Sequence, residues 1–169
     1  AAARGVAGVV GGRGMDGEES RAGVGGGDTC GKSHGEVEPE YVGAEPEGCP
    51  GGAQGLGWKN SFGSGKGVDA LTSGLEGAWT NEPSKWDNGF LDNLFKYDWE
   101  LTRSPAGAKQ WTPKDPAAHD DVPDAHDASK RPAPMMLTTD LALKLDPIHG
   151  PIAKRFHGTP DHLADASAR

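Results

Sequence analysis

Long apolar runs are missing from this chain of 169 residues, of which only 34% are apolar. A membrane-spanning helix needs about 20 consecutive, mostly apolar residues. The start of the chain is rich in Ala, Gly and Val but lacks the long apolar centre of a secretory signal. We therefore expect no membrane association and no secretory leader.

Basic residues and cysteines are also scarce. The chain has 17 Lys and Arg against 25 Asp and Glu, a net charge of −8, whereas nucleic-acid-binding proteins present a basic patch or stripe. Its two cysteines, Cys30 and Cys49, form no disulfide framework of spacings and favour a reducing compartment. We expect a cytoplasmic protein that binds no nucleic acid, and a disulfide between the two cysteines stays an open alternative.

Glycine is abundant and unevenly distributed. Two thirds of the 27 glycines fall within the first 60 positions. Residues 1–57 are expected to form a Gly-rich, poorly ordered segment, and residues 58–169 a helical part of the same truncated domain. Asp16 and Glu19 have the spacing of a capping box and could open a helix that runs to Asp28, but each interior Gly costs it about 1 kcal/mol relative to Ala.

The second part of the chain carries helical patterns. Leu71, Leu75 and Trp79 recur every four residues, which predicts one helix face. A second apolar stripe predicts another helix and comprises Trp86, Phe90, Leu91, Leu94 and Phe95. The segment 104–107 is a turn signal, and 112–134 is expected to be a long loop.

Two further helices are expected near the end of the chain. Asp146-Pro147 and Thr159-Pro160 each place a capping side chain before a Pro suited to the first helical position. Ile148, Ile152 and Phe156 should form the inner face of the first helix, and the second should continue past Arg169. The expected fold class is all-α, with long loops.

The run from Gly26 to Gly35 reads G-G-D-T-C-G-K-S-H-G and fits two chemistries. Its first eight residues, Gly26 to Ser33, satisfy the phosphate-loop pattern G-x-x-x-x-G-K-[ST]. A phosphate loop must follow a buried strand and open a helix. Arg21 to Gly25 is too poor in large apolar residues to be such a strand, and Pro39 would stop a helix within a turn.

Five further segments follow in order along the chain. They are Q-G-L-G-W-K-N from Gln54, T-S-G-L-E-G-A-W-T-N from Thr72, K-W-D-N from Lys85, Y-D-W-E-L-T-R-S-P-A-G-A from Tyr97 and M-L-T-T-D-L-A-L from Met136. In this order they resemble segments of the catalase-peroxidases, a haem peroxidase family of bacteria and fungi, and the strongest part of the resemblance spans residues 55–169. The run at Gly26 is similar to the family's proximal haem-ligand segment, G-G-H-T-F-G-K-T-H-G. The resemblance implies a partial haem-peroxidase helical domain, the second half of the family's N-terminal haem domain.

The resemblance also implies site residues. Asp140 matches the carboxylate that accepts a hydrogen bond from the proximal His, and Trp79 matches the indole that donates to the same carboxylate. Lys32, Ser33 and Ser73 match polar residues in the haem surroundings. The cofactor implied is haem b, whose iron the family holds through the proximal His.

Asp28 stands where the family has that histidine. A carboxylate has no second N–H, so it reaches Asp140 with a hydrogen bond only when one of the two carboxyls is protonated. Two close carboxylates also raise one another's pKa, and a neutral acid is a poor iron ligand. We therefore expect weak or absent haem binding. Two alternatives stay open: His34 or Cys30 could replace the iron ligand, or Asp28, Cys30 and His34 could hold a zinc ion.

The resemblance implies an oxidoreductase that removes hydrogen peroxide by dismutation and by oxidation of small electron donors, as a homodimer in its full form. Peroxide cleavage also needs distal Arg, Trp and His residues, and their R-x-x-x-W-H type signature does not occur in this sequence. The isolated chain is therefore expected to be inactive. Two other functions stay open, a nonenzymatic remnant or binding module and a nucleotide binder through Gly26–Ser33.

Overall fold

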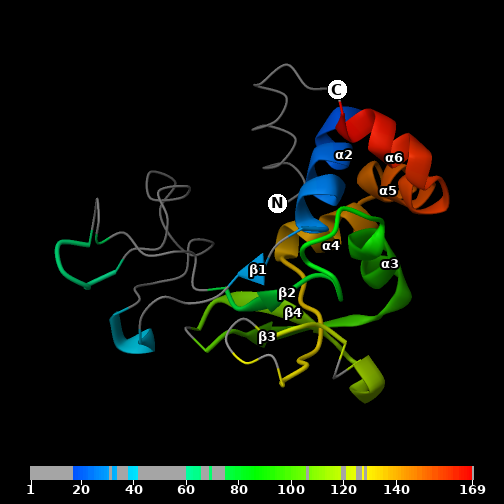
Figure 1. Ribbon diagram of the computed structural model, residues 1–169. Coiled ribbons are helices and arrows are strands. Elements are labelled where there is room, and N and C mark those ends of the chain that lie inside the picture. Colours follow the sequence, from blue (N-terminus) through cyan, green and yellow to red (C-terminus); the bar gives the residue numbers. More distant parts are fainter. Residues whose placement is uncertain are drawn as a thin grey trace.

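The computed structural model describes residues 17–30, 32–33, 38–41, 60–65, 69, 75–105, 107–118, 121–124, 127 and 129–168. The described part is mostly helical and also contains two small antiparallel sheets (Figure 1). Its helices are α2 (Gly17–Asp28), α3 (Gly89–Lys96), α4 (Thr138–Leu145), α5 (His149–Gly158) and α6 (Pro160–Ser167), with short 3-10 turns at Pro39–Tyr41 and Pro116–Ala118. Its strands are β1 (Lys32–Ser33), β2 (Gly77–Ala78), β3 (Trp99–Arg103) and β4 (Lys109–Pro113).

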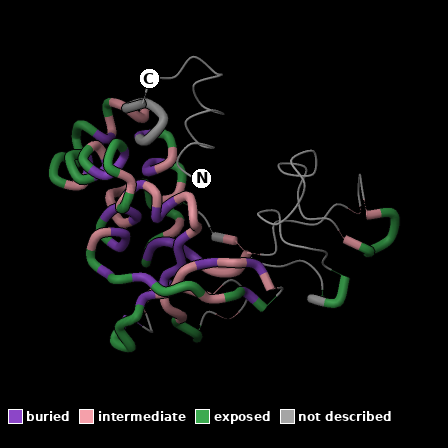
Figure 2. The backbone as a smooth tube through the Cα atoms, turned by 180° about the vertical axis from the view of Figure 1, so that it is seen from behind, coloured by how far each residue is buried: buried purple, intermediate pink, exposed green. Residues whose placement is uncertain are grey.

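The helices pack on one another at one side of the molecule, and the strands lie at the other (Figure 1). α2 packs against α3, α5 and α6, while α4 packs against α3, α5 and β4. Buried positions gather where these helices meet one another and the strands (Figure 2). Among the described residues, no helix has both the length and the apolar character needed to cross a membrane.

Helix α3 confirms the second apolar stripe of the sequence. Phe90, Leu91 and Leu94 are buried and Phe95 packs partly buried against the core. Trp86 was wrongly included, because it precedes the helix and 45% of it is exposed.

The helix expected to carry Leu71, Leu75 and Trp79 on one face is absent from the part that the structure describes, residues 75–80. β2 begins at Gly77, which has a φ of 129°, a conformation that side-chain-bearing residues rarely adopt. Ser33 pairs with Gly77, and Lys32 with Ala78. Trp79 is nevertheless buried, so the four-residue spacing found a core residue but the wrong secondary structure, and Leu71 lies outside the described residues.

An antiparallel hairpin, β3–β4, also corrects the all-α expectation. Trp99 pairs with Pro113 and Arg103 with Lys109 across the hairpin. The predicted turn at residues 104–107 joins the strands, and Gly107 has a φ of 88° there. Aromatic and β-branched residues suit strands, and Trp99, Thr102, Trp111 and Thr112 supply them here. The loop expected from Thr112 therefore begins two residues later than predicted.

The two C-terminal helices are present, with differences at their starts. The carboxylate of Asp146, the predicted cap, accepts hydrogen bonds from the backbone N–H groups of Ile148 and His149 at 2.9 and 3.0 Å. Helix α5 itself begins at His149, after that cap. α6 has Pro160 at its first turn as predicted. The hydroxyl of Thr159, however, donates to the carbonyl of Arg155 at 2.6 Å and does not cap α6.

The inner face of α5 also differs from the expected one. Ile148 is 69% exposed, whereas His149, Ala153 and Phe156 are buried. These three follow one another at four- and three-residue spacing, so they share a helix face. Helix α6 ends at Ser167, and Arg169, past which it was expected to continue, lies outside the described residues.

The glycines of α2 bring it close to α6. A Cβ at Gly26 would lie 2.9 Å from Oγ of Ser167. That hydroxyl donates to the carbonyl of Ala22 at 3.0 Å, which ties the two helices together. The glycines that lower helix propensity therefore also permit this contact.

Candidate functional site

Asp140 is the centre of a buried hydrogen-bonded cluster. Only 1% of it is exposed. Its Oδ2 accepts hydrogen bonds from the indole Nε1–H of Trp79 at 2.8 Å and from the backbone N–H of Leu137 at 2.7 Å. The second bond satisfies a free donor before the first turn of α4. Asp140 thus both caps its helix and holds the indole.

The backbone at Trp79 and the residues that follow it are also held by hydrogen bonds. Nδ2 of Asn93, a buried residue of α3, donates to the carbonyl of Trp79 at 2.8 Å. The hydroxyl of Thr80 donates to the carbonyl of Thr29 at 3.2 Å, and the hydroxyl of Thr29 donates to the carbonyl of Asp87 at 2.9 Å. These bonds join the segment after β2 to the end of α2.

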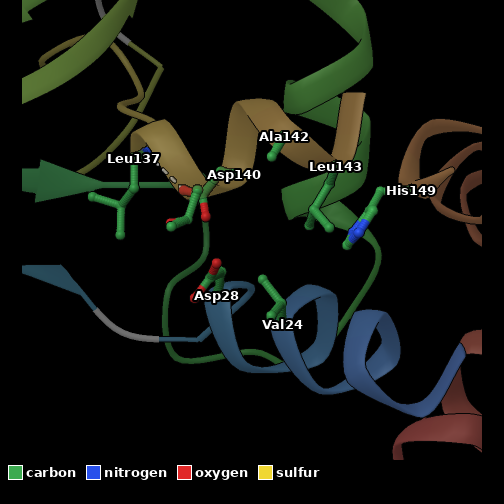
Figure 3. A pocket seen from close by; sticks show the side chains of 8 residues that line it. Val24, Asp28, Leu137, Asp140, Ala142, Leu143 and His149 are labelled. Carbon is green, nitrogen blue, oxygen red and sulfur yellow. Dashed lines mark hydrogen bonds between the residues drawn. The ribbon is translucent and has the colours of Figure 1, made fainter. Parts of the chain in front are cut away.

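Asp28 is the last residue of α2 and its carboxyl points toward that of Asp140 (Figure 3). Burial, the charge of Asp140 and hydrogen bonding to Asp140 raise the pKa of Asp28 to about 9. Burial also raises the pKa of Asp140, while its hydrogen bonds from Leu137, Asp28 and Trp79 oppose that rise. At neutral pH Asp28 therefore keeps its proton and shares it with Asp140 through a hydrogen bond.

A cavity of about 190 Å³ lies beside the two carboxyl groups, between α2 and α4 (Figure 3). Its lining is mainly apolar apart from Thr139, the two acids and His149. The lining residues are Val24, Asp28, Leu137, Thr139, Asp140, Ala142, Leu143 and His149.

His149 lines the cavity although its place in the sequence assigned it no chemistry. It is only 6% exposed and reaches the cavity wall. The spacing of His149, Ala153 and Phe156 on one face of α5 was the signal that could have found it.

The other predicted site residues are placed less fully. Ser33 is half-buried in β1, and Lys32 is described by its backbone alone. Ser73, His34 and Cys49 lie outside the described residues. Cys30 is exposed, and among the described residues no group of three or more His, Cys, Asp or Glu is placed to hold a metal ion.

The phosphate-loop pattern does not have its required setting. Gly26, Gly27 and Asp28 belong to the end of α2, and Lys32 and Ser33 form a strand. A phosphate loop instead precedes a helix, whose N-terminal N–H groups bind the phosphates. Here the helix presents its C-terminal end, which disfavours anions.

Comparison with known proteins finds close relatives of this segment. The chain is 68% identical over 156 residues to catalase-peroxidase 1 of Cupriavidus pinatubonensis (strain JMP 134 / LMG 1197), covering 92% of this chain and 21% of that protein. The chain is homologous to the catalase-peroxidases. It is also 64% identical over 155 residues to the catalase-peroxidase of Caulobacter sp. (strain K31), over 92% of the chain and 21% of the relative.

A third relative, the catalase-peroxidase of Marinomonas sp. (strain MWYL1), is 59% identical over 169 residues, which is 100% of this chain and 23% of the relative. The chain thus spans about a fifth of the length of the catalase-peroxidases that it matches. No protein-family model matches the chain.

Catalase-peroxidases imply haem, and the described residues do not fit its iron. The donor set at the end of α2 is a carboxyl group that is neutral at pH 7 and turned onto Asp140. A neutral acid is a poor ligand, and it cannot supply the basic imidazole that favours O–O cleavage in haem peroxidases. Among the described residues, the carboxylate of Asp140 and the indole of Trp79 are in contact, but none is placed as a ligand for iron.

Proposed function

We propose that this chain corresponds to the proximal side of the haem pocket in an enzyme that removes hydrogen peroxide. The hydrogen bond from Trp79 Nε1–H to the buried carboxylate of Asp140 carries the proposal. A carboxylate that is held in this way can orient and polarise a donor aimed at its other oxygen. In the whole protein that donor would be the N–H of an imidazole bound to haem b.

The whole protein would dismutate peroxide and oxidise small electron donors, as a homodimer. Lys32, Ser33 and Ser73 would lie around the haem, and Asp28 would occupy the position of the iron ligand. As this chain stands, Asp28 closes onto Asp140 and the chain would bind haem weakly or not at all. We therefore expect no release of oxygen from peroxide when the purified chain is mixed with haem.

A chimera tests the site assignment. This chain would replace the corresponding fifth of the Cupriavidus protein, with either Asp28 or the Asp28→His substitution. Haem titration followed at the Soret band should show binding that is at least about tenfold tighter with histidine, since the imidazole supplies a basic ligand together with an N–H for Asp140.

Two control variants make the result specific. Asp28→Asn replaces the carboxyl group with a neutral amide and adds no basic ligand, so it should bind haem as weakly as Asp28. Cys30→His adds an imidazole on an exposed residue two positions away. Equal haem affinity in all four chimeras would refute the proximal-site assignment. Tight haem binding by the Cys30→His chimera would show that a histidine on this segment binds iron without the geometry of position 28.

A further inference from the structure

A second pocket, of about 400 Å³, lies between β2, the β3–β4 hairpin and the segment 123–135. It shares no lining residue with the cavity beside Asp140. Its volume is in the range of about 300–1,000 Å³ that is usual for small-molecule sites. Two kinds of surface line it, a polar set of side chains from the hairpin and a mainly apolar set from the segment that follows the hairpin.

The polar set is formed by the register of the hairpin. Thr102 of β3 stands opposite Gln110 of β4, and Thr112 follows Gln110 by two positions. Side chains that are opposite one another across a strand pair, or two positions apart along a strand, lie on the same face of the sheet. The two hydroxyl groups and the amide therefore form one cluster, and all three residues line the pocket.

This cluster has hydrogen-bonding capacity that the protein does not use. Gln110 is only 9% exposed, and its amide accepts from the N–H of Glu76 at 3.1 Å and donates to the carbonyl of Glu76 at 2.8 Å. An amide nitrogen carries two N–H donors, so one of them remains. The hydroxyls of Thr102 and Thr112 make no hydrogen bond with the described residues. The pocket thus offers neutral donors and acceptors on one side.

The apolar set is rigid and comes from a short stretch of chain. It comprises Pro123, Pro132, Ala133, Pro134 and Met135. Pro134 and Met135 are buried, and the N–H of Met135 donates to the carbonyl of Ala78 at 2.9 Å, which fixes this wall against β2. A thioether makes favourable contacts with an aromatic ring. The wall therefore suits the flat face of such a ring.

The charges around the pocket favour an uncharged ligand. Its charged lining residues are Glu76, Arg103 and Asp124, two acids and one base, so an anion gains little there. Arg103 already donates to the carbonyl of Gly107 at 2.7 Å, and Asp124 accepts from the N–H of Asp127 at 2.9 Å. A sugar would place hydroxyl groups against the prolines without partners. A phenol instead has hydroxyl groups at its edge and apolar faces.

We propose that the pocket between the β3–β4 hairpin and the segment 123–135 binds a small neutral phenol. Its hydroxyl groups bond to the side chains of Thr102 and Gln110, and its ring lies against Pro134 and Met135. Binding involves no covalent or redox step and no haem. The site is independent of Asp28 and Asp140, so it goes beyond the function proposed above.

Resorcinol is the probe, and meta-xylene is its match in shape without hydroxyl groups. The chain, labelled with ¹³C at its three methionine methyl groups, would be titrated with each at about pH 6.5, where a phenol keeps its proton. The resonance of Met135 is assigned through Met135→Leu. We expect resorcinol to shift the Met135 methyl resonance through the ring current of the bound ring, and to shift the side-chain amide resonances of Gln110.

Thr102→Val tests the hydrogen bond, because valine keeps the β-branched shape and lacks the hydroxyl. It should weaken resorcinol binding at least about fivefold and leave meta-xylene binding unchanged, since a single neutral hydrogen bond is lost. Thr102→Ser keeps the hydroxyl and should bind resorcinol like the parent chain. Leu101→Thr changes an exposed residue on the other face of β3, and it should also bind like the parent.

Filling the pocket is the second test. Ala133→Leu adds bulk to the apolar wall and should abolish the shift of the Met135 methyl resonance. Ala117→Leu makes the same change on an exposed residue that does not line the pocket, and it should have no effect. Circular dichroism checks that each variant is folded, and Thr112→Val replaces any hairpin variant that is not.

Three results would each overturn the proposal. Resorcinol that leaves the Met135 resonance unmoved does not bind there. Equal weakening of resorcinol and meta-xylene by Thr102→Val would show that the hydroxyl is not a partner, and undiminished binding in Ala133→Leu would place the phenol elsewhere. The experiment contains neither haem nor peroxide, so its failure leaves the proximal-site assignment to be decided by the chimeras.

Discussion

Replacing Asp28 with Asn should make the chain more stable at neutral pH and change how its stability depends on pH. The folded protein keeps a proton on Asp28 up to about pH 9, whereas the ordinary pKa is 3.8. The stabilising effect of this raised pKa is fully present below about pH 4 and is lost as the pH rises to 9, because the unfolded chain releases its proton first. Stability should therefore fall across this window in the parent chain.

The magnitude follows from the shift. One bound proton corresponds to about 1.4 kcal/mol for each pH unit. From the ordinary pKa of 3.8 to neutral pH, the loss reaches about 4 kcal/mol as an upper limit, because Asp140 shares the same proton. The amide introduced by Asp28→Asn would donate an N–H to Asp140 without taking a proton from solvent, so the variant avoids this loss.

Urea unfolding followed by tryptophan fluorescence, from about pH 5 to pH 9, measures the effect through the free energy of unfolding. The difference between Asp28→Asn and the parent should grow with pH. Asp127→Asn is the control, because hydrogen bonds from Ser129 lower the pKa of this exposed acid and its contribution has the opposite sign. Parallel pH profiles for the parent and Asp28→Asn would refute the shared-proton interpretation.

Two other substitutions test the scaffold around the site. Trp79→Phe removes the donor to Oδ2 of Asp140. The free energy of unfolding in urea at pH 7 should therefore fall by about 2–3 kcal/mol, as for other hydrogen bonds to charged groups. An unchanged midpoint of the urea transition would show that this hydrogen bond does not stabilise the fold. Gly77→Ala should cost about 1–3 kcal/mol, because the residue has a φ of 129° and an added Cβ would lie 2.9 Å from Cγ of the buried Met135. Gly107→Ala is the control, since Gly107 also has a positive φ but no atom lies within 4 Å of the added Cβ. If Gly107→Ala lowers the free energy of unfolding as much as Gly77→Ala does, the contact with Met135 adds nothing.

Local patterns predicted the helices well where the burial of one face decides the structure. The stripe from Phe90 to Phe95 and the Pro at position 160 both marked real helices. The same reasoning failed at Leu75 and Trp79, because a strand can also bury a residue and the backbone of Gly77 leaves the helical region. The hairpin was missed for a related reason, since its pairing joins Trp99 to Pro113 and is not visible in either strand alone.

The site was partly predictable, and only through the resemblance. The sequence places Asp28, Trp79 and Asp140 far apart, and no spacing rule brings them together. Their contact depends on α2, the segment after β2 and α4 packing around common core residues. His149 could have been found from periodicity, whereas the cavity beside it could not, because an empty volume depends on how side chains from three helices fit together.

The cluster explains how the fold tolerates aspartate at position 28. The backbone N–H of Leu137 and the indole N–H of Trp79 need Asp140 as their acceptor whichever residue occupies position 28, since both would otherwise be buried without partners. A protonated Asp28 can donate one hydrogen bond to Asp140, as the N–H of an imidazole would, so the buried carboxylate keeps a donor on that side. In the proposed site, aspartate lacks the second nitrogen with which a histidine at position 28 would bind iron. Loss of ligation and retention of the fold are therefore separable, which is why Asp28→Asn should raise stability while only Asp28→His should raise haem affinity.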